Sequence, residues 1–234
     1  MQRHLSRLVL ALSVLVGALP SHAQQAVATI AAPAAATADV RWEDSIEAFE
    51  AADRVHRPET GGVLFVGSSS IRLWNDLEQQ FSNVPGVIKR GFGGSTLSAC
   101  SHYVQRLVTP YKPRLVLVYA GDNDLAEGRT PEQVAYSFTR FVNGVRAELP
   151  DTRIAYISIK PSPARIGLAE PIRETNRLIR EYISHGQNLD YVDIYTPMLT
   201  ADGSPRAELF RSDMLHLNDT GYALWKRVIS AHLP

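Results

Sequence analysis

The stretch that decides the fold is Val63-Leu64-Phe65-Val66-Gly67-Ser68-Ser69-Ser70-Ile71-Arg72-Leu73-Trp74. Its first four residues form a short apolar run, which predicts a buried strand. The glycine and the three serines after this run predict a tight turn that leads into a short helix. The stretch therefore predicts a strand, a turn and a helix, which together make the first unit of an α/β fold.

The same alternation of apolar runs and amphipathic stretches continues along the chain. Apolar runs rich in β-branched residues predict further strands at Val87–Ile88, Leu115–Tyr119, Ile154–Ile157 and Tyr191–Ile194. Amphipathic stretches predict helices at Ser98–Thr109, Pro131–Leu149, Glu170–His185 and Asn218–His232, and an earlier one on which Trp42, Ile46 and Phe49 recur at helical spacing. This alternation predicts a parallel sheet covered on both faces, a three-layer α/β/α domain.

The N-terminal segment is predicted to lie outside this domain. Met1–Ala23 combines two arginines, an apolar run of about a dozen residues and small residues before the expected cleavage site, which is typical of a secretory signal peptide. The apolar run is shorter than the roughly 20 residues that span a bilayer, so a membrane anchor is not expected. We therefore expect export to the periplasm or the medium, an alanine-rich tether over residues 24–39, and a folded domain over residues 40–234.

Composition excludes several kinds of partner. Loss of the signal peptide removes two arginines and no acidic residue from a chain with 24 basic and 24 acidic residues, so the mature net charge is slightly negative. This charge gives no support to nucleic acid or an anionic membrane as a partner. The only cysteine is Cys100, which excludes an intramolecular disulfide, and no Cys/His cluster has zinc spacing. We expect no metal and no cofactor; the oligomeric state is left open.

Polar residues follow the first three predicted strands, at the edge of a parallel sheet where ligands bind. Ser69 is placed where a helix N-terminus would supply N–H groups to an oxyanion, although serines also cap helices. Gly94 belongs to a glycine-rich loop that contains no nucleotide-binding motif. Asn123 follows the third strand and has an amide to donate, or it forms an Asx turn. Leu125 and Ala126 do not sustain the calcium loop that the neighbouring acidic residues suggest.

A carboxylate and an imidazole lie three residues apart near the C-terminus, in Asp213-Met214-Leu215-His216. At this spacing Asp213 would hold the Nδ1 proton of His216 and leave Nε2 free to act as a base. The other histidines lie in the signal peptide, near the chain end, ahead of the first strand, or on helices where no acidic orienting residue is evident. His216 is therefore the candidate general base.

The segments that contain Ser69, Gly94, Asn123 and the Asp213–His216 pair form four sequence blocks. In their order and positions these blocks resemble the SGNH hydrolases, also called the GDSL-like family, which are named for a Ser, a Gly, an Asn and a His. Here the four residues fall on Ser69, Gly94, Asn123 and His216, and the resemblance covers nearly all of the predicted domain. It implies a flavodoxin-like α/β/α sandwich with about five parallel strands and metal-free ester hydrolysis. It also implies a catalytic triad that adds Asp213, and an oxyanion hole made by the Ser69 and Gly94 N–H groups and the Asn123 side chain.

One block departs from the family pattern. The family usually has Gly-Asp-Ser where this chain has Gly67-Ser68-Ser69. Because three serines are adjacent, the assignment of Ser69 depends on its spacing from Gly67, with Ser70 and then Ser68 as the alternatives.

The sequence says less about the substrate. No stretch of the mature chain is long and apolar enough to form a lid, so we expect short-chain acyl esters, acetyl esters above all, on a small molecule or a carbohydrate. Asp122 and Lys160 are candidate substrate-binding residues, and so is Trp74, although core packing is the more usual role of a large aromatic residue.

The same catalytic residues would permit other reactions. Transfer of the acyl group to a sugar or peptidoglycan hydroxyl stays open, as does lysophospholipase or thioesterase activity. A non-catalytic binding module is disfavoured because none of the four block residues is lost.

Overall fold

The computed structural model describes residues 40–234. The predicted signal peptide and tether lie outside these residues. Within them, one sheet holds five strands, all parallel, in the order β2-β1-β3-β4-β5. The strands are β1 (Val63–Gly67), β2 (Val87–Gly91), β3 (Leu115–Tyr119), β4 (Arg153–Ile157) and β5 (Leu189–Val192). This is the flavodoxin-like order, and it confirms the predicted α/β fold class.

The helices alternate with these strands along the chain. They are α1 (Glu43–Val55), α2 (Ser69–Arg72), α3 (Leu77–Gln80), α4 (Leu97–His102), α5 (Val104–Leu107), α6 (Asp122–Ala126), α7 (Pro131–Arg146), α8 (Ala169–Ser184) and α9 (Asp219–Ser230). Short 3-10 helices are η1 (Val40–Trp42), η2 (Thr109–Tyr111), η3 (Pro163–Leu168), η4 (Thr196–Met198) and η5 (Ala207–Leu209). None of the helices in this part of the chain is both long and apolar enough to cross a membrane.

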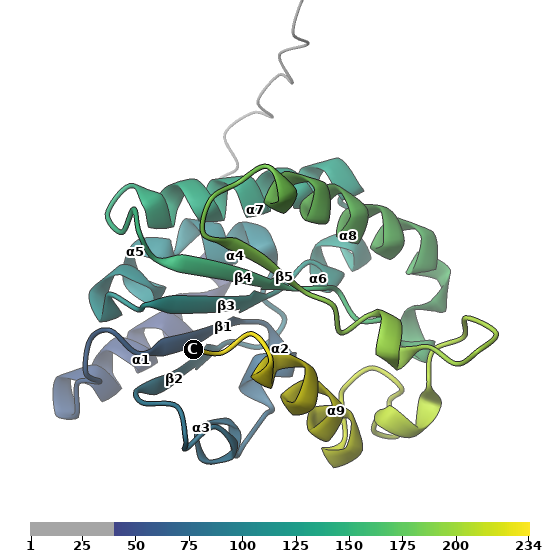
Figure 1. The fold of residues 1–234 in the computed structure, drawn as a ribbon, viewed down its shortest axis with the longest axis horizontal. Coiled ribbons are helices and arrows are strands. Elements are labelled where there is room, and N and C mark those ends of the chain that lie inside the picture. The colour runs from purple at the N-terminus through teal and green to yellow at the C-terminus, as the bar shows by residue number, and fades with distance from the viewer. Residues whose placement is uncertain (1–39) are drawn as a thin grey trace, which may run out of the picture. The chain divides into compact units, whose positions relative to one another are not determined.

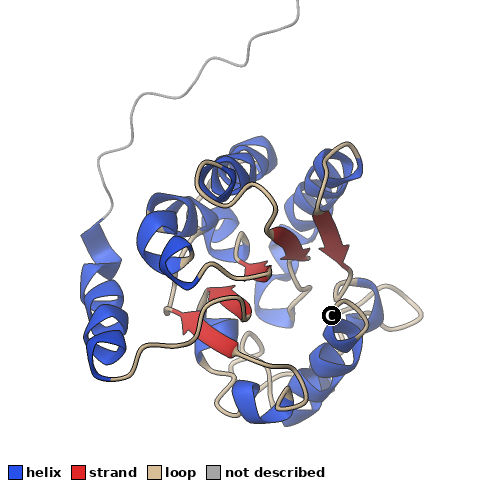
Figure 2. Ribbon diagram, turned by 60° about the vertical axis from the view of Figure 1, so that its left-hand side comes forward, coloured by secondary structure: helices blue, strands red, loops and turns tan. Residues whose placement is uncertain are grey.

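Helices cover both faces of the sheet. Figure 1 shows α4, α5, α7 and α8 on one side of the strands and α2, α3 and α9 on the other. The same layering is visible after rotation in Figure 2, where the red strands lie between the blue helices. Each face has its own cluster of buried apolar side chains, because successive residues of a strand point to opposite faces. The protein therefore has the three layers expected from its sequence.

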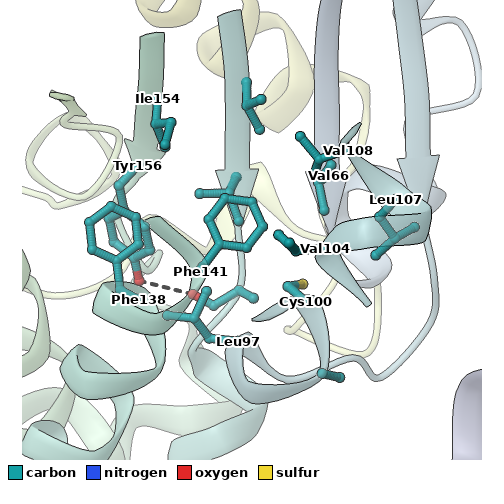
Figure 3. Packing of buried hydrophobic residues seen from close by; sticks show 14 of the residues in the cluster. Val66, Leu97, Cys100, Val104, Leu107, Val108, Phe138, Phe141, Ile154 and Tyr156 are labelled. Carbon is teal, nitrogen blue, oxygen red and sulfur yellow. Dashed lines mark hydrogen bonds between the residues drawn. The ribbon is translucent and has the colours of Figure 1, made fainter. Parts of the chain in front are cut away.

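The first cluster joins the long helix α7 to the sheet. Phe138 and Phe141 of α7 pack against the strand residues Ile154 and Tyr156 (Figure 3). The buried Tyr156 hydroxyl donates a hydrogen bond to the carbonyl of Ala120, with 2.9 Å between the oxygens. Burial of this aromatic surface fixes α7 and the chain after β3, which carries part of the candidate site.

The second cluster contains Trp74. Its side chain is completely buried, stacks on the ring of Tyr222 at a centroid distance of 5.0 Å and meets Trp225 of α9 edge to face. Trp74 therefore packs in the core, and its prediction as a substrate-binding residue is wrong because its ring has no exposed surface. The packing has another consequence, since it holds α9 against the segment that follows Ser69.

Most elements differ from their predicted bounds by a few residues at an end, and two differ in other ways. The single helix expected at Ser98–Thr109 is two short helices that meet at Tyr103, and the second ends at Leu107. After Leu107 the chain leaves the α conformation at Val108, whose φ is −124°, and Thr109 begins the 3-10 helix η2. The last strand lies two residues earlier than expected, because Asp193 turns away to accept hydrogen bonds from the backbone and hydroxyl of Thr196.

Candidate active site

The turn after β1 requires a glycine. Gly67 has a φ of +143°, and a Cβ at this position would lie 1.9 Å from the carbonyl oxygen of Tyr119 on the neighbouring strand. The N–H of the next residue, Ser68, donates to the same carbonyl at 3.0 Å, so the turn stays close to the end of β3. The glycine therefore lets the chain leave the strand abruptly and begin α2 at Ser69.

The three adjacent serines have different environments. Ser68 and Ser70 are buried, and neither hydroxyl has a hydrogen-bond partner. Ser69 is partly exposed, and its Oγ lies 3.1 Å from Nε2 of His216. Of the three serine hydroxyls, the structure thus brings only that of Ser69 together with the candidate base.

A turn held by one carboxylate presents His216. Oδ1 of Asp213 accepts hydrogen bonds from the backbone N–H groups of Leu215 and His216, at 3.0 and 2.9 Å. Oδ2 of the same group lies 2.6 Å from Nδ1 of the His216 ring. The turn also requires Met214 to adopt a positive φ of 54°. Asp213 therefore fixes both the backbone and the ring orientation of the histidine.

The contacts of the ring also determine its tautomer. A carboxylate can only accept, so a neutral His216 ring carries its proton on Nδ1 and directs the lone pair of Nε2 at the Ser69 hydroxyl. The hydrogen bond from His216 and those from the backbone hold the pKa of Asp213 well below its usual range. Asp213 remains ionised at neutral pH and is thus able to stabilise a positively charged imidazole.

The loops that follow β2 and β3, the two strands that flank β1, contact each other and carry the predicted oxyanion donors. Gly94 lies in the loop after β2, is exposed and has a φ of +70°, with open space around it. Asn123 lies at the start of α6, and its Nδ2 donates to the Ser95 carbonyl at 3.0 Å. An amide group has two N–H donors, so one remains for a ligand.

The buried carboxylate of Asp124 also connects the loop after β2 to the start of α6. Its Oδ2 accepts from the backbone N–H of Leu97 at 2.8 Å, at the N-terminus of α4. Burial raises the pKa of Asp124 to about 6, against the opposing effect of these N–H donors. The contact makes the position of the Gly94 loop depend on α6.

Asp122 and Lys160 are buried together beneath the site. Nζ of Lys160 lies 2.8 Å from Oδ2 of Asp122, and the Tyr119 hydroxyl donates to the same oxygen at 3.1 Å. Burial acts to raise the pKa of Asp122, but the positive charges of Lys160 and Arg165 outweigh it and hold the pKa below its ordinary value. The Lys160 side chain is only 2% exposed and the Asp122 side chain only 6%, so the prediction of both as substrate-binding residues is wrong.

We expect Lys160→Met to lower the free energy of unfolding by about 3–5 kcal/mol, because it leaves a buried carboxylate without its closest cation. Urea denaturation measures the change. The matched control is Arg177→Met, which removes exposed ion pairs to Glu174 and Glu181 and should leave the free energy of unfolding nearly unchanged. Equal small losses in both variants would contradict a structural role for the buried pair.

Arg165 is not among the site residues predicted from the sequence. This residue lies in η3, after β4, and its Nη2 donates to Oδ1 of Asn123 at 2.8 Å. Its one signal in the sequence is its place in a proline-rich loop at a strand end. In the described part of the chain, no group of three or more His, Cys, Asp or Glu side chains is arranged to hold a metal ion.

Comparisons with known proteins give one family and several related folds. The chain matches the family model described as the GDSL-like Lipase/Acylhydrolase family over residues 60–224. No curated protein matches it at a significant level.

Three solved structures illustrate the shared fold. A protein from Streptococcus pneumonia, provisionally described as a platelet activating factor, is 18% identical with a TM-score of 0.74, covering 82% of this chain and 92% of that one. A GDSL-like lipase from Bacteroides thetaiotaomicron VPI-5482 is 20% identical with a TM-score of 0.69, covering 80% and 96%. An acetyl esterase mutant with acetate ion is 18% identical with a TM-score of 0.59, covering 74% and 96%.

Proposed function

Because the chain belongs to the GDSL-like lipase/acylhydrolase family, we propose that it is a serine esterase in which Ser69 is the nucleophile, His216 the general base and Asp213 the residue that orients the base. The observation that carries the proposal is the continuous contact from Ser69 Oγ to His216 Nε2 and from His216 Nδ1 to Asp213, at 3.1 and 2.6 Å. The first of these distances permits transfer of the proton from Ser69 Oγ to His216 Nε2.

The first half of the reaction acylates the serine. Nε2 of His216 takes the Ser69 proton while Oγ forms a bond to the ester carbonyl carbon, which gives a tetrahedral oxyanion. The oxyanion then collapses, the bond to the alcohol oxygen breaks, and the leaving alkoxide takes the proton from His216. The products are an acyl-enzyme and a free alcohol.

The second half repeats these steps with water. His216 removes a proton from water as the water oxygen attacks the acyl carbon, and the proton returns to Ser69 Oγ as the acid leaves. Both tetrahedral intermediates carry a negative oxygen. The proposed donors to it are the backbone N–H groups of Ser69 and Gly94 and the second N–H of the Asn123 amide, each worth roughly 3 kcal/mol of barrier.

Release of acid in water tests the proposed reaction. The purified protein is incubated with p-nitrophenyl acetate, and acetate and p-nitrophenol are both measured. Equal amounts of the two, formed without an added acceptor, support hydrolysis. Acyl release that requires a sugar or peptidoglycan hydroxyl would instead make the protein a transferase, because the same residues serve either acceptor.

The surroundings of the site favour a short acyl group. Among the described residues, the large apolar side chains that are well exposed are Val55, Tyr136, Ile166 and Met214. Met214 lies between the two candidate triad residues, and its carbonyl accepts from Ala164 at 3.1 Å, which brings the segment with Ile166 close to it. Two exposed apolar side chains, Met214 and Ile166, offer little apolar surface to a long acyl group. Short-chain esters, including acetylated carbohydrates, are therefore the proposed substrates.

We predict that kcat/KM is higher for acetyl to butyryl esters than for decanoyl esters. Each CH₂ that stays in water forgoes about 0.8 kcal/mol of binding, so lengthening the chain brings no gain. A series of p-nitrophenyl esters of graded length measures the ratio. A rise in kcat/KM that continues beyond about eight carbons would contradict the short acyl site.

Export completes the proposal. The composition of Met1–Ala23 supports cleavage after Ala23, which would deliver the protein to the periplasm or the medium. Mass spectrometry of the protein recovered outside the cytoplasm should find Gln24 as its first residue. An intact N-terminus on a cytoplasmic protein would contradict export.

A further inference from the structure

The Asn123 amide has one orientation that satisfies both of its neighbours. Its nitrogen donates to the carbonyl of Ser95 at 3.0 Å, and its oxygen accepts from Nη2 of Arg165 at 2.8 Å. If the amide were rotated by half a turn, its oxygen would face the carbonyl and its NH₂ would face the guanidinium. Both contacts would then become repulsive.

Arg165 is itself held from the other side. Its Nη1 lies 3.2 Å from Oδ2 of Asp122, the residue before Asn123. The Arg165 side chain is only 17% exposed, and the carboxylate it faces is also paired with Lys160. One guanidinium thus bridges two consecutive residues at the start of α6, through a hydrogen bond to Asn123 and an ion pair with Asp122, and its planar shape is suited to this task.

The backbone near Arg165 is tied to the loop with the catalytic histidine. The N–H of the preceding residue, Ala164, donates to the carbonyl of Met214 at 3.1 Å. Met214 lies between Asp213 and His216. The arginine therefore joins the loop after β3 to a segment that also contacts the turn between Asp213 and His216.

On these contacts, and resting on the proposed function, we propose that Arg165 is a positioning residue for ester hydrolysis that acts through Asn123. It holds the amide oxygen so that the second N–H of Nδ2 stays directed at the oxyanion. A positive group at the amide oxygen also polarises the amide, which makes its N–H a stronger donor. The benefit arises when negative charge develops, so it belongs to the transition state and changes kcat more than KM.

A double-mutant cycle on Arg165 and Asn123 tests this coupling, with p-nitrophenyl acetate as the substrate. Asn123→Ala should lower kcat by about 10²- to 10³-fold. Arg165→Met should lower kcat by about 10- to 100-fold with KM nearly unchanged, the size expected for a hydrogen bond to a charged group. In the Asn123→Ala background, Arg165→Met should have little further effect, because its route to the oxyanion is already lost.

Two further variants separate positioning from folding. Arg165→Lys keeps a cation for Asp122 but lacks the fork that reaches both residues, so it should fold normally and still lose kcat. Arg173→Met removes an exposed arginine paired with Glu170 on α8 and should leave kcat unchanged.

The outcomes distinguish this inference from the proposed function. Additive losses in the cycle, or a higher KM with kcat unchanged in Arg165→Met, would overturn the role of Arg165 and leave the esterase proposal intact. Full activity in Asn123→Ala would overturn both the oxyanion assignment and the coupling to Arg165. The inference is supported if Arg165→Met and Arg165→Lys both lower kcat and if this loss is absent in the Asn123→Ala background.

Discussion

Ser69→Ala should lower kcat for ester hydrolysis by about 10⁴- to 10⁶-fold, because no other hydroxyl of the site can form the acyl-enzyme. The contact between Ser69 Oγ and His216 Nε2 at 3.1 Å is the basis of this expectation. The protein should stay folded, since the hydroxyl is partly exposed and lies outside the apolar core. Stopped assays with p-nitrophenyl acetate, together with the far-UV circular dichroism spectrum, measure both properties.

The neighbouring serines supply matched controls. Ser68→Ala and Ser70→Ala each remove a buried hydroxyl that has no hydrogen-bond partner, so activity and stability should change little. If Ser69→Ala kept full activity while one of these variants lost it, the nucleophile would be reassigned to that neighbour.

His216→Ala should have an effect of similar size. Without the imidazole, nothing takes the proton of Ser69 or returns one to the leaving alcohol. The double variant Ser69→Ala/His216→Ala should be about as impaired as either single variant, because the residues of a triad act as a unit. The kcat values of the three proteins, measured at the same pH, test the prediction.

His102→Ala is the control for the histidine. His102 is exposed on α4 and packs edge to face on Tyr103, so its loss should not change kcat. Losses that multiply in the double variant would mean that His216 and Ser69 act independently, and the proton-transfer account would then fail.

The sheet and the turns at its strand ends were predictable because they depend on local patterns. The buried run Val63–Val66 and the glycine after it specify a strand and a sharp turn without reference to the rest of the chain. The turn at Asp213 is equally local, since one carboxylate binds N–H groups two and three residues ahead. Such features need only a few adjacent residues.

Burial was harder to predict because it depends on segments far apart in the sequence. The sequence could not place Trp74 against Tyr222, and it could not show that Asp122 and Lys160 neutralise each other below the surface. Spacing from Gly67 favoured Ser69 among the three adjacent serines, but the sequence could not show its contact with a histidine 147 residues away. Arg165 went unassigned for the same reason, because its partner Asn123 is 42 positions earlier.

Labelling with a fluorophosphonate probe tests the central claim most directly. The probe reacts covalently with a serine that a neighbouring base activates, and peptide mapping by mass spectrometry then locates the modified residue. We predict one labelled site, Ser69, and no labelling in His216→Ala. Labelling of Ser68 or Ser70, or unchanged labelling without His216, would contradict the proposed triad.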